Sequence, residues 1–260
     1  MTPPTSTAHA VEFRDVSVFV DHQREILHQL NLDVVAGETT VFLGRSGSGK
    51  TTTLKLINHL LTPSSGEVRV EGKATTQWDP IRLRRRIGYV IQETGLFPHF
   101  TVERNVGLVP SLEGWEPERI HQRVEELLRL VGLGAEFAPR LPSQLSGGQR
   151  QRVGVARALA ADPPILLMDE PFGALDPITR AELQREFLAL QKRLQKTVVF
   201  VTHDVREALM IATRVSLFEA GRLVGSYTPA EFAHAPDPLI RQYLAAFEPG
   251  RASLGGMAEN

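Results

Sequence analysis

The stretch Gly44-Arg45-Ser46-Gly47-Ser48-Gly49-Lys50-Thr51 decides the fold of this chain. It follows a short apolar run, residues 40–43, which predicts a buried strand. A loop of this kind turns successive backbone N–H groups inward and adds the positive end of the next helix, so it suits a phosphate group. Apolar residues at helical spacing follow the loop and predict one face of that helix: Leu54, Ile57, Leu60 and Leu61.

This strand, loop and helix predict a site for a nucleoside triphosphate. In such a loop the lysine reaches the β- and γ-phosphates and the next hydroxyl binds Mg²⁺, which gives Lys50 and Thr51 these roles. The alternative is an ordinary Gly/Ser turn before a helix, which the flanking strand disfavours. The expected phosphate-binding residues are Gly44, Arg45, Ser46, Gly47, Ser48, Gly49, Lys50, Thr51 and Thr52.

Composition restricts the class of protein. The chain has 260 residues, of which 42% are hydrophobic and 23% are charged, as in folded globular proteins. The formal net charge of -1 favours neither nucleic acid nor an anionic membrane, and we expect no nucleic-acid partner. Cysteine is absent, which excludes disulfides and thiolate metal sites. Without a membrane-spanning apolar stretch or a signal peptide, we expect a cytoplasmic protein that reaches a membrane only through partners.

The order of the patterns predicts an α/β fold. Early strand patterns precede the loop, and later strands alternate with helices, which indicates parallel pairing. Between about 93 and 161 the pattern is helical. We therefore expect a P-loop core with a mixed sheet, an antiparallel β subdomain and a helical insertion. The domain would cover residues 11–247, with flexible tails at 1–10 and 248–260. The expected strands are residues 11–20, 26–35, 40–43, 67–70, 87–90, 164–170 and 198–201.

Polar residues follow two of the expected parallel strands. Asp169 and Glu170 end one apolar run, and His203 follows the next. Ligands in such sheets bind beyond the carboxyl ends of the strands, so these residues and Gly44 should lie at one edge. Asp169 suits Mg²⁺, Glu170 can deprotonate the attacking water, and His203 can contact the γ-phosphate. The alternative is that the two carboxylates only cap the turn before Pro171.

A second phosphate-binding pattern begins the helix after Leu145. Its residues, Leu145-Ser146-Gly147-Gly148-Gln149, place a serine and paired glycines at a helix N-terminus. One chain cannot easily place two such sites around one triphosphate. The pattern therefore indicates that each site is completed by another copy of the chain.

Together these motifs resemble the ATP-binding subunit of ABC transporters over residues 11–245. The resemblance implies the ABC ATPase fold and a head-to-tail homodimer with ATP and Mg²⁺ at its interface. The matching motifs are Walker A at 44–51, the Q-loop at Gln92, the signature at 145–149, Walker B at 165–169, the D-loop at 174–176 and the switch histidine at His203.

The resemblance also implies residue roles. The implied catalytic residues are Glu170, His203, Gln92 and Lys50, and the implied metal ligands are Thr51, Gln92 and Asp169. Further implied nucleotide contacts are Ser146, Gly147, Gly148, Gln149 and Asp176. The family usually stacks an aromatic residue from the first strands on adenine. Here that position falls near Phe19-Val20, with the valine at the favoured register, so either Phe19 is the contact or the adenine contact is weaker than usual in the family.

Residues 87–99, 106–110 and 172–180 resemble importers of quaternary amines such as glycine betaine, choline and carnitine. This resemblance implies an ATPase at the cytoplasmic face of the membrane, bound through permease subunits and served by an extracytoplasmic solute-binding protein. Import of another small solute, such as a polar amino acid, stays open, as does a soluble ABC ATPase. After Gln92, the residues Leu96, Phe97 and Phe100 either contact the permease or pack into the helical insertion.

Overall fold

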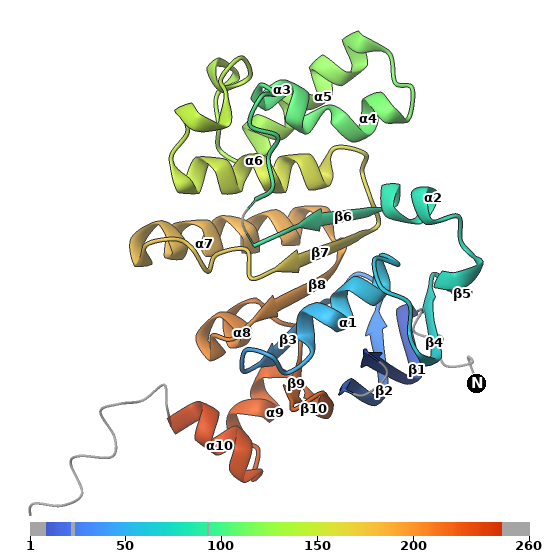
Figure 1. The fold of residues 1–260 in the computed structure, drawn as a ribbon. Helices are drawn as coiled ribbons and strands as arrows, with labels where there is room; N and C mark the ends of the chain where they lie inside the picture. Colours follow the sequence, from blue (N-terminus) through green and yellow to red (C-terminus); the bar gives the residue numbers. More distant parts are fainter. Residues whose placement is uncertain (1–8, 22–23, 93, 246–260) are drawn as a thin grey trace, which may run out of the picture.

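Two sheets form the framework of the protein in the computed structural model, which describes residues 9–21, 24–92 and 94–245 (Figure 1). The antiparallel sheet has the order β2 (Arg24–Val35), β1 (His9–Val20), β4 (Ser65–Val70) and β5 (Lys73–Ala74). The six-stranded sheet has the order β10 (Arg222–Tyr227), β9 (Arg214–Glu219), β3 (Thr39–Gly44), β8 (Thr197–Thr202), β7 (Ile165–Asp169) and β6 (Ile87–Val90). It is parallel except for β10, which confirms the expected mixed sheet.

The helices form three groups around these sheets (Figure 1). Helix α1 (Lys50–Ile57) lies between the two sheets, and the short α2 (Pro80–Arg85) leads into β6. The helical insertion gathers beyond the β6 edge and contains α3 (Val102–Val106), α4 (Leu108–Leu112), α5 (Pro117–Leu130) and α6 (Gly147–Leu159). The remaining helices are α7 (Pro177–Leu194), α8 (Val205–Ile211), α9 (Pro229–His234) and α10 (Pro238–Ala245). Short 3₁₀ turns occupy Thr75–Gln77, Ala135–Phe137 and Pro142–Gln144.

Successive side chains of the central strands enter two different hydrophobic cores. Strand side chains alternate between the two faces of a sheet. In β3, Val41 and Leu43 belong to the core on the side of α8, which continues into the helical insertion, while Phe42 between them belongs to the core formed with α1 and the antiparallel sheet. All three are fully buried. Strand β3 is therefore fixed from both faces, and so is the start of the glycine-rich loop that follows it.

Helix α1 ends earlier than the sequence predicts. Leu60 and Leu61 lie outside the helix with 47% and 38% of their surface exposed, so their predicted place on its buried face is wrong. His59 takes a left-handed conformation with φ of 52°. The Arg84 guanidinium, from α2, donates to the carbonyls of Asn58 and His59 over 3.2 and 2.7 Å. Because these donors come from another helix, the apolar spacing alone could not reveal the end.

The domain boundaries can be compared only in part with the expected ones. Strand β1 begins at His9, two residues before the expected start of the domain at residue 11. Residues 1–8 and 246–260, which hold the rest of the expected tails, lie outside the described residues, as does residue 93 at the expected start of the insertion. Within the described part of the chain, no helix is long and apolar enough to cross a membrane.

Candidate active site

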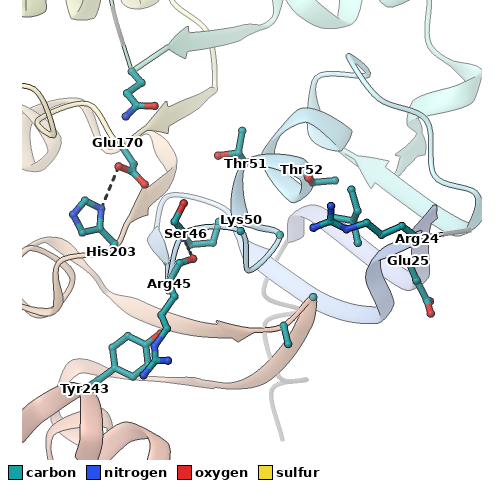
Figure 2. Close-up of a pocket in the computed structure, with 16 residues that line it drawn as sticks. Arg24, Glu25, Arg45, Ser46, Lys50, Thr51, Thr52, Glu170, His203 and Tyr243 are labelled. Atoms are coloured by element: carbon teal, nitrogen blue, oxygen red, sulfur yellow. Dashed lines mark hydrogen bonds and ion pairs between the residues drawn. The ribbon is translucent and has the colours of Figure 1, made fainter. Parts of the chain in front are cut away.

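A cavity of about 940 Å³ opens where the carboxyl ends of the parallel strands meet the glycine-rich loop (Figure 2). Most of the residues predicted to bind phosphate or to act in catalysis lie on its wall. They are Arg45, Ser46, Gly47, Gly49, Lys50, Thr51, Thr52, Gln92, Glu170 and His203. Gly44 and Ser48 lie buried in the loop, next to Lys50.

Glycine is required at two positions of the loop. A Cβ atom at Gly44 would lie 2.4 Å from the carbonyl oxygen of Phe218, a backbone atom that cannot move aside easily. Gly49, which precedes α1, has a φ of 100° and provides no side-chain cap for the helix. The first N–H groups of α1 therefore lack a side-chain acceptor at a point where the cavity is open. This arrangement suits an anion.

The Lys50 amine is held by the loop itself. Its Nζ donates to the carbonyl oxygens of Gly44 and Arg45, each over 2.8 Å, and it lies 3.5 Å from the Ser48 hydroxyl. Burial lowers the pKa of Lys50, and the nearby carboxylates, with Glu170 the stronger, oppose this shift in part. Neutral carbonyls are weak partners for an ammonium group compared with phosphate oxygens. The amine is thus placed to exchange these bonds for bonds to a phosphate.

Two of the three predicted metal ligands, Thr51 and Asp169, meet beside the loop. The Thr51 hydroxyl donates to Asp169 Oδ1 over 2.9 Å, across the gap between α1 and the end of β7. Burial raises the pKa of Asp169, and the hydrogen bond from Thr51 opposes that shift. Tyr89 lies next to the same carboxylate, and burial together with Asp169 raises the pKa of its hydroxyl. The motifs did not reveal Tyr89, because its place depends on the pairing of β6 with β7.

Glu170 and His203 pair at one end of the cavity. The Glu170 carboxylate Oε2 lies 3.1 Å from His203 Nδ1, as Figure 2 shows. Glu170 has a φ of 43°, a left-handed conformation that costs energy for a residue with a side chain. Its N–H donates to the Val201 carbonyl over 3.0 Å, which holds the strained residue at the end of the sheet. This strained conformation lies directly after the end of β7, at the residue predicted to be the general base.

The second glycine pattern lies away from this cavity. Residues 146–149 are not on its wall, although they begin α6 as expected. Ser146 Oγ accepts from the Gln149 N–H over 3.2 Å, and Gln149 Oε1 accepts from the Ser146 N–H over 2.9 Å, which forms a capping box. Asp176 is also outside the cavity, where it caps α7. Hydrogen bonds from Thr179 are the main cause that lowers the pKa of Asp176.

The structure does not bring Phe19 to the cavity. Phe19 is 43% exposed and is not among the lining residues. Residues that the sequence analysis did not single out line the cavity instead. They are Arg24, Glu25 and Ile26 from β2, Ala220 and Gly221 from the β9–β10 turn, and Tyr243 from α10. No motif marks these positions, because only the packing of distant strands and of α10 brings them to the loop.

The fold and this cavity define a P-loop nucleotide-binding domain of the α/β class. The glycine-rich loop, the Thr51–Asp169 contact and the Glu170–His203 pair lie together at one sheet edge. Residues 27–173, more than half of the chain, match the family described as ABC transporter. This protein belongs to the ABC transporter family.

Relatives agree with this assignment. The chain is 50% identical over 226 residues to the glycine betaine/carnitine/choline transport ATP-binding protein OpuCA of Bacillus subtilis. The matched region covers 87% of this chain and 60% of OpuCA. It is 47% identical to the glycine betaine uptake system ATP-binding protein YehX of Escherichia coli, covering 94% of this chain and 78% of YehX. This chain therefore spans less than two thirds of OpuCA.

A solved structure shares the fold. It is the dimeric post-hydrolysis state of the ATP-binding cassette MJ0796 bound to ADP and Pi, with a TM-score of 0.75 and 35% sequence identity. The match covers 84% of this chain and 98% of that cassette. The expected ABC ATPase fold is thus confirmed.

Proposed function

We propose that this chain binds and hydrolyses ATP in a homodimer that powers an importer for a quaternary amine such as glycine betaine, choline or carnitine. The observation that carries the hydrolytic part is the shared position of three groups. The open phosphate loop, the Thr51–Asp169 contact and the Glu170–His203 pair all meet at one cavity. These are the groups that phosphoryl transfer requires, since its catalysis is mainly positioning and charge stabilisation.

Each residue has a distinct task in this proposal. The loop N–H groups and Lys50 hold the β- and γ-phosphates. Glu170 positions water for attack on the γ-phosphorus and accepts its proton, while the bond to the ADP oxygen breaks. His203, hydrogen-bonded to Glu170, contacts the γ-phosphate and fixes the orientation of the carboxylate. The general base and its partner thus act as a pair.

The donors beside the loop fit Mg²⁺. The Thr51 hydroxyl and the Asp169 carboxylate are already 2.9 Å apart, and Gln92 lines the same cavity with an amide oxygen available. Hard oxygen donors with few carboxylates are what Mg²⁺ prefers in proteins. A Mg²⁺ ion held by these residues would neutralise phosphate charge during transfer.

A second copy completes the site in this proposal. Ser146, Gly147, Gly148 and Gln149 lie outside the cavity of their own chain, at a helix start that suits an anion. In a head-to-tail dimer they would contact the phosphates held by the other chain, with Asp176 close to the interface. The dimeric cassette MJ0796 bound to ADP and Pi supports this arrangement.

The names of the relatives support the transported solute. OpuCA is named as an ATP-binding protein for glycine betaine, carnitine and choline transport, and YehX as one for glycine betaine uptake. We infer permease subunits in the membrane, an extracytoplasmic solute-binding protein, and a peripheral position for this chain at the cytoplasmic face. The alternative solutes are other small molecules such as polar amino acids. A soluble ABC ATPase without a permease is the alternative class.

Two experiments test the proposal at separate levels. Co-purification of the tagged chain from membranes should recover an integral permease, and vesicles with both should take up radiolabelled glycine betaine only with ATP inside. Loss of uptake in the Glu170→Gln variant, with an unchanged Glu182→Gln control, would tie uptake to hydrolysis. A chain that never associates with a permease contradicts the transport role.

The solute is tested on the binding protein of the same transporter. Calorimetry should compare glycine betaine, choline and carnitine with ordinary amino acids. We expect tight binding of a quaternary amine, because aromatic ring faces recognise such cations. Tight binding of an untrimethylated amino acid, with none of a quaternary amine, would refute this part of the proposal.

A further inference from the structure

Among the residues that the structure describes, no aromatic side chain from β1 or β2 lies on the cavity wall. Phe19 and Val20 end β1 with 43% and 41% of their surface exposed, and neither lines the cavity. The lining residues from this region are Arg24, Glu25 and Ile26, at the start of β2. A nucleotide base in this cavity therefore meets an arginine and an isoleucine where a ring was expected.

The cavity has two distinct ends (Figure 2). Glu170 and His203 lie at one end, beyond Ser46 and Lys50, and they mark the place of the γ-phosphate. Thr52 lies on the far side of the loop, at the first turn of α1, and the Arg24 side chain extends toward it. A triphosphate bound along the loop would direct its base away from Glu170 and toward Arg24.

We propose that the Arg24 guanidinium stacks on the base of the bound nucleotide, with Ile26 as the apolar wall beside it. This inference rests on the proposed ATP binding and names the residue that holds the base. A guanidinium plane stacks on aromatic rings and is weakly hydrated, so it can take the place of an aromatic side chain. In the described part of the chain, the Arg24 side chain has no hydrogen bond or ion pair that would hold it elsewhere.

The neighbouring charged residue does not compete for this role. Glu25 pairs with His28 over 2.7 Å, so its carboxylate is directed to another residue of β2. The other Lys and Arg residues on the cavity wall belong to the phosphate loop or to its end: Lys50 donates to the Gly44 and Arg45 carbonyls, and Arg45 is part of the loop itself. Arg24 is thus the basic side chain of this wall that comes from another element.

Tyr243 offers an aromatic ring on the same wall, and His203 is placed at the γ-phosphate end. Figure 2 places Tyr243 beside Arg45, at the start of the loop and on the opposite side from Thr52. Burial and the nearby Glu219 raise the pKa of its hydroxyl. For its base to stack on Tyr243, the nucleotide would have to extend from the phosphate loop in the direction opposite to Thr52. We therefore assign the base to Arg24.

The test separates contact with the base from contact with phosphate. Calorimetry should measure ATP and inorganic tripolyphosphate binding to the whole chain and to Arg24→Leu, which keeps the apolar stem. We expect ATP to bind about 3- to 10-fold more weakly to this variant, the range of one cation–ring contact. Tripolyphosphate should bind as to the unmodified chain, which also shows that the variant is folded.

Three variants complete the test. Arg24→Lys keeps the charge but loses the plane, so it should weaken ATP binding too. Arg222→Leu, an exposed arginine beside Gly221 that is not on the wall, should change neither ligand. An equal loss for ATP and tripolyphosphate in Arg24→Leu, or no loss, overturns the proposal, as does a base-dependent loss only in Tyr243→Leu. If neither ligand binds the unmodified chain, ATP binding itself fails.

Discussion

Helices α1 and α6 both start at motifs that contain glycine and serine, yet only the N-terminus of α6 is capped by a side chain. Neither has an acidic residue in its first turn, so both leave the positive end of the helix available to an anion. Helix α1 has Gly49 before it, no side-chain cap and an open cavity in front. Helix α6 is closed by the capping box of Ser146 and Gln149 and begins outside that cavity.

This difference indicates that the two helix starts bind phosphate under different conditions. The open start can bind a phosphate within one chain, because its N–H groups have no competing side chain. At the capped start, the side chains of Ser146 and Gln149 satisfy two backbone N–H groups until a ligand arrives. We expect α6 to bind phosphate only when another copy brings one to it. Each prediction below tests one half of this comparison.

The largest effect is expected for Glu170→Gln, which should leave both helix starts intact. Loss of the general base should reduce ATP turnover at least about 100-fold, within the range of general base catalysis. ATP affinity should stay near that of the unmodified chain, and an ATP-bound dimer should accumulate in size-exclusion chromatography. The exposed Glu182→Gln is the matched control. Turnover near the unmodified rate would remove Glu170 from its assigned role.

The next effect concerns the α1 start alone. Lys50→Ala removes a charge-assisted contact to phosphate, so ATP affinity should fall about 10- to 100-fold by calorimetry. Ser146→Ala should not change this monomer affinity at all. A comparable loss of affinity in both variants would mean that the two helix starts share one site within a single chain.

The α6 start should show a smaller effect of a different kind. Ser146→Ala removes the N-cap, which should destabilise the chain by about 0.5–2 kcal/mol in chemical unfolding. ATP-induced dimerisation and turnover should fall as well, because the hydroxyl that would meet the partner's phosphate is gone. Ser146→Thr keeps a capping hydroxyl and should retain both properties. Normal turnover in the alanine variant contradicts the dimer role.

A substitution in the loop after Gln92 should have the smallest effect on phosphate binding at the two helix starts. Phe97 is 41% exposed, and its ring lies 5.2 Å from that of Phe100 between centroids. The buried Asn105 side chain holds this loop, accepting from the Phe97 N–H and donating to the Phe97 and Phe100 carbonyls. Leu96 instead packs on the core of the helical insertion. The exposed Phe97 ring thus favours a partner surface, while Phe100 is half-buried.

Phe97→Asp should therefore abolish transport in vesicles while leaving ATP binding unchanged in calorimetry. The charge would disrupt an apolar contact with the permease without reaching the cavity. Leu112→Asp, at an exposed position elsewhere in the insertion, is the control. Unchanged transport in the Phe97 variant would place the permease contact on another surface.

The sequence predicted those parts of the fold and the site that depend on local pattern. The strand before Gly44, the strand ending at Asp169 and the position of His203 after β8 follow from apolar runs and motif spacing. Because these strands are parallel, the rule for ligands at their carboxyl ends also predicted that the groups would meet.

The remainder depends on contacts between distant segments. The early end of α1 requires Arg84 from α2, and Tyr89 reaches Asp169 only through the register of β6 on β7. Arg24 and Tyr243 reach the cavity from the second strand and the last described helix. Neither residue belongs to a periodic pattern or a motif. Sequence spacing within a segment therefore could not identify them.

The pairing of β3 also determines when the nucleotide site can exist during synthesis of the chain. Both neighbours of this strand arrive late, since Thr39 pairs with Val198 and Thr40 with Arg214. Chains grow from the N-terminus, and pairings between distant residues form slowly. A nascent chain that has reached the helical insertion already contains the whole glycine-rich loop but lacks both strands that orient it. We therefore expect nucleotide affinity to arise only after β8 and β9 have been synthesised, so that ATP stabilises the late stages of folding and not the early ones.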